Sequence, residues 1–170
     1  MKVIHNAKQK SPMTAAIRVL KAANATYTEH TYAYEERGGT TVITEQLGVD
    51  EHRVVKTLIF EEPDSHKPFI ILMHGDRSVS TQKMARVLGV KRVAPCSMEQ
   101  AERNSGYHCG GTSPFGTRKQ MPVYVQQSIL DLPEIYINGG QRGFVLQISP
   151  AEVVRILHPI PVDVAIDPLD

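Results

Sequence analysis

A run of apolar residues from Val54 to Glu62 is typical of a β-strand that is covered on both faces. A single lysine, Lys56, stands in this run on the same face as Val54, Leu58 and Phe60. Lysine is almost never fully buried without a partner, because its ammonium must find acceptors, lose its charge or line a cavity that holds a polar ligand. Lys56 is therefore a candidate functional residue. The alternative is a lysine near a strand end whose amine reaches the surface past its own aliphatic stem.

The same spacing of apolar and polar positions predicts further elements along the chain. Strands are expected at residues 27–34, 69–73, 123–125, 134–137, 144–148 and 162–165. Helices are expected from Ser11 to about Asn24, up to Leu47 and Gly48, from Ser80 or Thr81 to Gly89, at residues 97–104, and after Ser149 and Pro150. Strands and helices are interleaved without strict βαβ regularity. The predicted class is therefore α+β, a mixed α/β arrangement with a largely antiparallel or mixed sheet.

Length and composition fit one folded unit. The chain has 170 residues, of which 41% are hydrophobic, so a single domain over residues 1–170 is expected. The formal net charge is +1, and any contact with nucleic acid must therefore be local. Cys96 and Cys109 lack CxxC spacing, which suits a reducing cytoplasm. Residues 1–10 lack the apolar core of a signal peptide, and no run approaches the roughly 20 apolar residues of a membrane helix, so a cytoplasmic protein without a membrane partner is expected.

Residues 106–119 form a glycine-rich, basic loop. Its glycines allow the backbone to approach a ligand closely and to present bare amides and carbonyls. Gly111 and Gly116 have the separation found in a phosphate-binding loop, but Thr117 and Arg118 stand where Lys and Ser or Thr are required. Nucleotide hydrolysis is therefore not expected. An ordinary turn is the simpler explanation, yet so many small residues beside two cations are more typical of a ligand-facing loop.

A second glycine cluster, residues 138–143, joins two predicted strands. Asn138 and Gly139 make a dipeptide that is typical of a hairpin turn, so a structural role explains most of this segment. The turn does not require Arg142. This arginine is either a planar fork for a phosphate or carboxylate, or a solvent-facing turn residue.

Familiar catalytic and metal-binding spacings are missing from the sequence. Cys109 follows His108, but sequence neighbours in a loop rarely face each other, so a cysteine nucleophile is not expected. The seven histidines show no HxH or HExxH spacing, so neither a metal nor another cofactor is expected. A basic cluster is either a solvated face or a contact for an anionic ligand. Its members are Lys83, Arg86, Lys91 and Arg92.

Three motifs, in this order, resemble the YbaK family of aminoacyl-tRNA deacylases, which are free-standing editing domains related to the insertion domain of bacterial prolyl-tRNA synthetase. They are Val55-Lys56-Thr57-Leu58, Gly106-Tyr107 leading into Gly110-Gly111-Thr112-Ser113-Pro114-Phe115-Gly116, and Tyr136-Ile137-Asn138-Gly139-Gly140 with Arg142-Gly143. The resemblance covers about residues 13–166. It implies a single domain with a mostly antiparallel, barrel-like mixed sheet flanked by helices. It also implies removal of a wrong amino acid from tRNA, typically Cys or Ala from tRNA(Pro).

The resemblance also implies roles for individual residues. Lys56 matches the family's signature lysine, whose ammonium is expected to bind the terminal phosphate or ribose, or to polarise the ester carbonyl. Gly110 and Gly111 are expected to hold the aminoacyl adenosine end, and Tyr32 matches the pocket tyrosine. Further substrate-binding positions are expected at Thr57, Thr112, Ser113, Asn138, Gly139 and Gly140. Hypothetical contacts to the tRNA backbone are Lys83, Arg86, Lys91, Arg92, Arg118, Lys119 and Arg142.

Two positions depart from the cysteine-specific members of that family. Asn138 stands where they have Ser, and Val145 stands where they carry an Asp in the following strand. An asparagine still donates and accepts hydrogen bonds, whereas Val145 cannot replace a carboxylate that recognises a substrate group. The expected substrate is a small mischarged amino acid, Cys first and then Ala or Ser. A pocket that excludes the larger cognate residue by size would explain such selectivity.

The expected function is trans-editing deacylation of a mischarged tRNA, most of all tRNA(Pro). The expected partner is aminoacyl-tRNA, and prolyl-tRNA synthetase is the candidate for a second partner. In the cysteine-specific members the substrate thiol is thought to attack its own ester, which agrees with the lack of a side-chain nucleophile here. One alternative is a non-catalytic module that binds aminoacyl-tRNA or a synthetase. The presence of Lys56 argues against it, and Val145 argues mildly for it. Another is a hydrolase of simple acyl esters.

Overall fold

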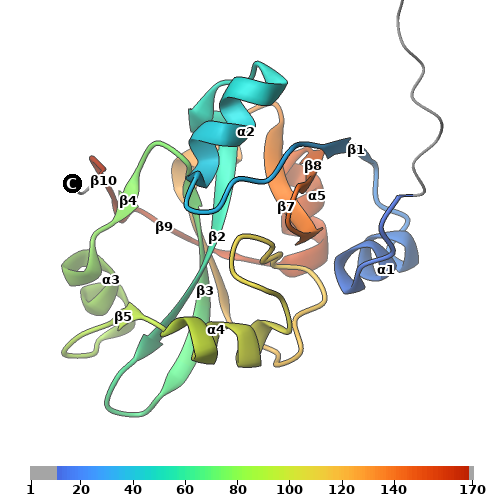
Figure 1. Ribbon diagram of the computed structural model, residues 1–170. Helices are drawn as coiled ribbons and strands as arrows, with labels where there is room; N and C mark the ends of the chain where they lie inside the picture. The colour runs from blue at the N-terminus through green and yellow to red at the C-terminus, as the bar shows by residue number, and fades with distance from the viewer. Residues whose placement is uncertain (1–10, 169–170) are drawn as a thin grey trace, which may run out of the picture.

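The computed structural model describes residues 11–168 (Figure 1). The helices are α1 (Ala15–Ala22), α2 (Gly39–Leu47), α3 (Thr81–Leu88), α4 (Met98–Ser105) and α5 (Pro150–Leu157), with 3-10 helices η1 (Glu51–Arg53) and η2 (Gln127–Asp131). The strands are β1 (Tyr27–Thr31), β2 (Val54–Glu62), β3 (Lys67–His74), β4 (Ser78–Val79), β5 (Ala94–Pro95), β6 (Val123–Gln126), β7 (Ile135–Gln141), β8 (Phe144–Ile148), β9 (Ile160–Val162) and β10 (Ala165–Ile166). The expectation for residues 1–10 lies outside the described residues.

Most strands belong to one mixed sheet in the order β1-β8-β7-β2-β3-β6-β9, and β5 pairs with part of β2. The pairs β1/β8, β7/β8, β2/β3 and β2/β5 are antiparallel. The pairs β2/β7, β3/β6 and β6/β9 are parallel. Strands β4 and β10 form a separate antiparallel pair. The predicted α+β class with a mixed sheet is confirmed, and the sheet is an open path of strands that needs no closed barrel.

Local sequence signals set the elements around β2. This strand spans Val54–Glu62, as the apolar run predicts, and it pairs with β3 through the predicted hairpin. Helix α3 begins after Ser80, whose side chain accepts a hydrogen bond from the Lys83 N–H, and it ends at Gly89 with a left-handed φ of 69°. Both ends agree with the caps that the sequence predicts.

Two predicted boundaries near the N-terminus are wrong. Helix α1 begins after Thr14 rather than after Ser11, because the Thr14 hydroxyl accepts a hydrogen bond from the Ile17 N–H and itself donates to the Gly139 carbonyl on β7, 2.5 Å away. Strand β1 ends at Thr31, whereas the sequence predicts a strand over residues 27–34. Beyond Thr31 the chain leaves β8 and crosses toward α2 (Figure 1).

The predicted strand at residues 162–165 is also wrong. The chain instead forms β9, which pairs with β6, and β10, which pairs with β4. The side-chain oxygen of Gln126 accepts hydrogen bonds from the N–H groups of Val164 and Ala165 at 2.8 and 3.0 Å. This side chain takes the place of a strand partner at the point where the chain changes sheets.

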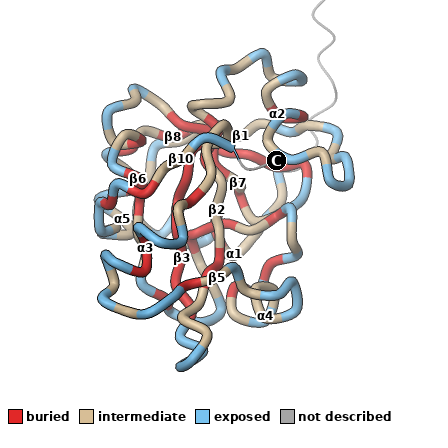
Figure 2. Tube along the Cα trace, turned by 90° about the vertical axis from the view of Figure 1, so that its left-hand side faces the viewer, coloured by how far each residue is buried: buried red, intermediate tan, exposed pale blue. Residues whose placement is uncertain are grey.

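Both faces of the central strands are covered, as predicted for β2, and buried positions run through these strands while the outer turns are exposed (Figure 2). On one face α1, α5 and the loop at residues 106–119 cover a large core that includes Val55 and Ile59. The other face carries two smaller clusters. The α2-side cluster consists of Ile43, Val54, Tyr136 and Val145. The α3-side cluster consists of Phe60, Phe69, Ile71, Met73, Val79, Met84, Ala85, Val93, Val162 and Val164.

The helices of the described part of the chain are short. Each of the five α-helices has eight or nine residues. Within residues 11–168, no helix has the length and apolar character needed to cross a bilayer.

Candidate functional site

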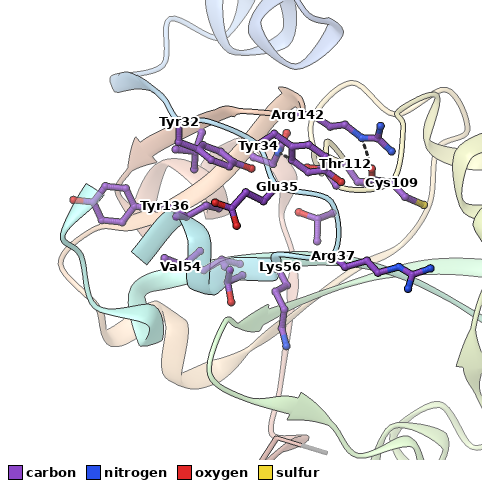
Figure 3. Close-up of a pocket in the computed structure, with 18 of the residues that line it drawn as sticks. Tyr32, Tyr34, Glu35, Arg37, Val54, Lys56, Cys109, Thr112, Tyr136 and Arg142 are labelled. Atoms are coloured by element: carbon purple, nitrogen blue, oxygen red, sulfur yellow. Dashed lines mark hydrogen bonds between the residues drawn. The ribbon is translucent and has the colours of Figure 1, made fainter. Parts of the chain in front are cut away.

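A cavity of about 460 Å³ lies where β2, β7 and β8 meet the segment between β1 and α2 and the glycine-rich loop (Figure 3). Its walls combine tyrosines, aliphatic side chains and five charged residues. The lining residues are Tyr32, Tyr34, Glu35, Glu36, Arg37, Gly39, Thr40, Ile43, Val54, Val55, Lys56, Thr57, Met98, Cys109, Gly110, Thr112, Tyr136, Asn138, Arg142 and Val145. A mostly apolar cleft with a few convergent polar groups is typical of a small-molecule site.

Lys56 lies in this cavity between the two small hydrophobic clusters. Val54 on one side belongs to the α2-side cluster, and Phe60 on the other belongs to the α3-side cluster. The Lys56 Nζ donates a hydrogen bond to the Arg77 carbonyl, 2.5 Å away. Its side chain extends away from the upper rim that carries Arg142 (Figure 3). An ammonium has three donors, so two remain for a ligand.

The environment of Lys56 acts on its charge in two opposing ways. Partial burial lowers its pKa below the ordinary value of 10.5, because the charged form loses water. The carboxylates of Glu51 and Asp76 oppose this shift in pKa. The Thr40 hydroxyl, which also lines the cavity, donates to Glu51 Oε1 at 2.8 Å and helps to hold that carboxylate in place.

The sheet opens beside Lys56. One edge of β2 pairs with β3 from Val55 to Glu62. On the other edge β7 pairs only with Val54 and Val55, and β5 pairs only with Phe60 and Glu61. Among the described strands, none therefore continues along β2 between these two short pairings. The strand that carries Lys56 thus borders the cavity where the sheet is interrupted.

The glycine-rich loop reaches the cavity through its first half. Gly110 and Thr112 line the cavity, whereas Gly111 and Ser113 are buried outside its lining. A Cβ atom on Gly110, whose φ is 88°, would lie 2.7 Å from the Tyr34 hydroxyl. A Cβ atom on Gly111 would lie 2.7 Å from the backbone nitrogen of Arg142. Both glycines therefore permit close packing of this loop against its neighbours.

Two polar side chains fix the inner part of the same loop. The Tyr107 hydroxyl donates to the Phe115 carbonyl at 2.5 Å. The Ser113 Oγ accepts a hydrogen bond from the Phe115 N–H at 3.3 Å. Ser113 is thus used by the loop itself, at a position that the cavity does not reach.

The second glycine cluster is part of a bulged hairpin. Asn138 and Gly139 lie within β7, and the turn is made by Arg142 and Gly143, so the expected Asn-Gly turn is wrong. The Asn138 Oδ1 accepts hydrogen bonds from the N–H groups of Gly140 and Gln141 at 2.7 and 3.2 Å, which stabilises the bulge. Of these residues, Asn138 and Arg142 line the cavity, whereas Gly139 and Gly140 do not.

The hairpin and the glycine-rich loop are joined by direct contacts. Asn138 Nδ2 donates to the Gly110 carbonyl at 3.2 Å. Arg142 Nε donates to the Cys109 carbonyl at 2.9 Å, and its guanidinium lies 5.0 Å from the centre of the Tyr34 ring (Figure 3). Arg142 is therefore more than a solvent-facing turn residue, because it fixes the upper rim of the cavity.

The remaining wall is a segment that the sequence did not single out. We call residues 32–38 the strap. Tyr32, the one predicted site residue in it, lines the cavity, and burial raises the pKa of its hydroxyl. The lining residues that were not predicted as site residues include Tyr34, Glu35, Glu36, Arg37 and, on α4, the exposed Met98. A glycine pair at 38–39 signals a turn, but no local pattern shows that the preceding residues fold over a cavity.

The predicted tRNA-contacting cations are dispersed over the surface. Of the seven candidates, only Arg142 lines the cavity. Lys83 and Arg86 lie on α3, followed by Lys91 and Arg92, and all four are exposed. Arg92 lies 3.6 Å from Asp64 in an exposed ion pair. Arg118 and Lys119 are exposed at the end of the glycine-rich loop.

The cavity contains one thiol, which is poorly suited to nucleophilic attack. Burial raises the pKa of Cys109, as does the Glu102 carboxylate, and nearby Arg142 lowers it less. A raised pKa keeps the thiol protonated, and the thiolate is the reactive form. The neighbouring His108 is exposed and lies 3.7 Å from Glu102. The two residues do not form the adjacent nucleophile and base of a cysteine hydrolase.

One group of metal-ligating side chains occurs among residues 11–168, formed by His52, His74 and Asp76. Its geometry is that of a hydrogen-bonded network. His52 Nδ1 lies 2.9 Å from Asp76, and His74 bonds to the His52 carbonyl and to Ser128 Oγ, each at 2.6 Å. The two imidazole rings stack with centroids 3.7 Å apart and planes 8° apart. Two parallel rings cannot both direct a lone pair at one ion between them, so this group fits a metal poorly.

Comparisons with known proteins cover most of the chain. The family described as "Aminoacyl-tRNA editing domain" matches residues 38–156. EbsC of Enterococcus faecalis, provisionally named a Cys-tRNA(Pro)/Cys-tRNA(Cys) deacylase, is 27% identical over 152 residues, which cover 89% of this chain and 92% of EbsC. A proline–tRNA ligase of Limosilactobacillus fermentum is 25% identical over 103 residues, which cover 59% of this chain but only 18% of the ligase.

Solved structures support the same fold. A protein provisionally described as a trans-editing enzyme for prolyl tRNA synthetase superposes with a TM-score of 0.77 at 20% identity, covering 91% of this chain and 98% of that one. The hypothetical protein APE2540 superposes with a TM-score of 0.81 at 24% identity, covering 89% and 99%. Because the family match covers more than half of the chain, this protein belongs to the aminoacyl-tRNA editing domain family.

Proposed function

We propose that this protein is a trans-editing deacylase that removes a small mischarged amino acid from tRNA, Cys first and then Ala or Ser, and that its main substrate is mischarged tRNA(Pro). The observation that carries the proposal is the partly buried Lys56 ammonium, which stands in a cavity bordered by the glycine-rich loop. The likeness to EbsC supports the choice of Cys as the first substrate.

Lys56 can supply electrostatic stabilisation without acting as a nucleophile. Attack on the ester carbonyl places negative charge on its oxygen, and a fixed cationic donor lowers the energy of that state. One Lys56 donor is used by the Arg77 carbonyl, which fixes the side chain, and the others are available to the developing oxyanion. In this scheme Lys56 is a catalytic residue, and Gly110 and Thr112 hold the ribose end through the loop backbone.

The attacking group comes from the substrate or from water. With a cysteinyl ester, the substrate sulfur forms a bond to the carbonyl carbon, the bond from that carbon to the ribose oxygen breaks, and the thiol proton ends on the ribose hydroxyl. With Ala or Ser, a water molecule supplies the oxygen and the proton. This scheme needs no enzyme nucleophile, which agrees with the raised pKa of the Cys109 thiol.

The inner walls of the cavity suit a small side chain. Val54, Tyr136 and Val145 are buried and together present apolar surface. With Val145 at this point of β8, the wall offers no carboxylate to orient a thiol or hydroxyl. Selection among Cys, Ala and Ser therefore rests on size and on polar groups elsewhere in the cavity.

We propose that exposed cationic side chains bind the backbone of the rest of the tRNA. Arg142 stands at the rim, and Arg118 and Lys119 follow the glycine-rich loop. Contacts of this kind make binding weaken steeply as the salt concentration rises. Replacing both Arg118 and Lys119 with Ala should therefore reduce the salt dependence of tRNA binding. An unchanged salt dependence of tRNA binding would show that these two residues do not contact the tRNA.

A prolyl-tRNA synthetase is the candidate second partner.

The test is the release of labelled amino acid from Cys-, Ala-, Ser- and Pro-charged tRNA(Pro), with the natural protein and with a folded Lys56→Ala variant. Lysine-dependent release from one or more small-residue species, with Pro-tRNA(Pro) spared, is the expected result. If none of the four species is deacylated while tRNA still binds, the protein is a non-catalytic tRNA-binding module and not a deacylase.

A further inference from the structure

The charges that line the cavity are of both signs and come from different elements. The cations are Lys56 on β2, Arg37 on the strap and Arg142 in the hairpin turn. Among residues 11–168, the only carboxylates in the lining are those of Glu35 and Glu36, both on the strap. Figure 3 shows the Glu35 carboxylate turned toward the space that Tyr32 and Lys56 border in this view.

Within the described structure, neither carboxylate is used by the protein. Glu35 and Glu36 make no side-chain hydrogen bond and no ion pair with any residue from 11 to 168. Arg142, by contrast, is engaged by the Cys109 carbonyl and the Tyr34 ring. Both glutamates are exposed, so in the free protein each carboxylate is solvated by water and can be reached by a ligand in the cavity.

The backbone that presents Glu35 is fixed at several points. The Gln46 side chain on α2 accepts from the Ala33 N–H at 2.7 Å and donates to the Ala33 carbonyl at 2.8 Å. The Gly38 N–H donates to the Glu35 carbonyl at 3.0 Å, which closes a turn. Within this turn Arg37 adopts a left-handed φ of 60°, a conformation that favours glycine.

Building on the proposed function, we propose that the Glu35 carboxylate binds the free α-ammonium of the aminoacyl group. An aminoacyl ester carries this single positive charge one carbon away from the carbonyl that Lys56 is placed to polarise. Two ammonium groups in one cavity repel each other, and an unpartnered carboxylate in the same lining offsets that repulsion. The β8 wall cannot do so, because it offers Val145.

A carboxylate that binds the α-ammonium restricts the class of substrate. The site accepts aminoacyl groups with a free α-amine and discriminates against the same groups when the nitrogen is acylated, as in N-acetylaminoacyl or peptidyl ends. Acylation removes the positive charge, so the carboxylate loses the charge-assisted hydrogen bond that the ammonium would donate to it. Glu35 is then a specificity-determining residue of the cavity, distinct from the catalytic Lys56.

The test uses a ligand that cannot be cleaved, so it needs no turnover. Binding of 3′-(L-alanylamino)-3′-deoxyadenosine and of its N-acetyl derivative is measured by calorimetry near pH 6.5, where an α-amine is mostly protonated. The proteins are the natural chain, Glu35→Gln and the matched neighbour Glu36→Gln, which removes the same charge from the same strap. The acetyl group adds the same bulk in every case, so a change in the affinity ratio between variants reports the lost charge interaction.

The natural protein should bind the free amine about tenfold more tightly than the acetylated ligand, as expected for one charge-assisted hydrogen bond. The ratio should approach one in Glu35→Gln and remain at the natural value in Glu36→Gln. The proposal is overturned if the natural protein does not prefer the amine, if Glu35→Gln keeps the full ratio, or if only Glu36→Gln loses it. Release assays on charged tRNA judge the deacylase separately, so failure of one proposal does not decide the other.

Discussion

The two halves of strand β2 have the same apolar pattern but different surroundings. The second half, from Ile59 to Glu62, pairs with β3 and β5 and places Phe60 in the α3-side cluster. The first half, from Val54 to Thr57, borders the cavity and carries the Lys56 ammonium. It also holds the only buried side-chain N or O atom without a hydrogen-bond partner within residues 11–168, the Oγ1 of Thr57. The second half of the strand thus serves packing, whereas the first half combines the buried Val54 and Val55 with Lys56 and Thr57 at the cavity.

This comparison shows how a sheet can hold a charged group without losing its core. The sheet is interrupted beside Lys56. At the same place a gap separates the α2-side cluster from the α3-side cluster. Lys56 fills neither cluster, so its charge is partly desolvated rather than fully buried. Substitutions in the packed half should therefore affect stability most, and substitutions in the cavity half should affect activity most.

The largest effect on stability is expected in the packed half. Phe60→Ala removes a ring that is 5% exposed and packs against Phe69, so it should lower the free energy of unfolding by about 3–5 kcal/mol. Urea denaturation measures this loss. The folded fraction of the variant should still release amino acid at a rate close to that of the natural protein. A loss below about 1 kcal/mol would show that this half of β2 is not a packed core.

An intermediate effect is expected from pH, and it has opposite signs for stability and activity. The pKa of Lys56 is lowered below 10.5 in the folded protein, so between the lowered pKa and 10.5 the unfolded chain binds more protons. The free energy of unfolding should therefore rise with pH in that window relative to a Lys56→Met variant. The rate of enzymatic release, corrected for spontaneous ester hydrolysis, should fall in the same window because the ammonium is lost. Parallel pH series of unfolding and release measure both. Rates that hold constant up to pH 10.5 would contradict the cationic role.

The smallest effect is expected at Thr57. Thr57→Val keeps the shape of the side chain and removes a buried hydroxyl that has no partner, so it should raise the free energy of unfolding by up to about 1 kcal/mol. Thermal or urea unfolding checks this against Ile59→Val, which should destabilise by about 1 kcal/mol. A destabilised Thr57→Val protein would mean that its hydroxyl has a partner in solution.

The sequence predicts best where the physical cause is local. The two-faced apolar run sets both ends of β2, and the caps Ser80 and Gly89 set both ends of α3. For the site, the presence of a single lysine within an otherwise apolar strand is enough to predict a functional role for Lys56. Lys56 lines the cavity together with six other predicted residues, whereas the remaining ten predicted residues do not, and the roles of all of them stay predictions.

The missed features depend on contacts between distant residues. Residues 32–34 of the strap are predicted as the end of a strand because residues 27–34 alternate, but Gln46 on α2 holds Ala33 away from the sheet. No local pattern signals that contact, so Glu35 and Arg37 could not be placed at a cavity from the sequence. In the same way, Thr14 replaces Ser11 as the cap of α1 because it also reaches the Gly139 carbonyl.

The most direct test of the account is the single-turnover rate of release from Cys-tRNA(Pro) at saturating protein, compared among the natural chain, Lys56→Met and Lys67→Met. Lys67 is the matched control, because it is an exposed lysine at the opposite end of the β2/β3 hairpin, paired in register with Glu62. We predict that Lys56→Met remains folded and loses at least about a hundredfold in rate, while Lys67→Met keeps the natural rate. Equal rates for the natural protein and a folded Lys56→Met variant would contradict the central claim that the cavity half of β2 carries the chemistry.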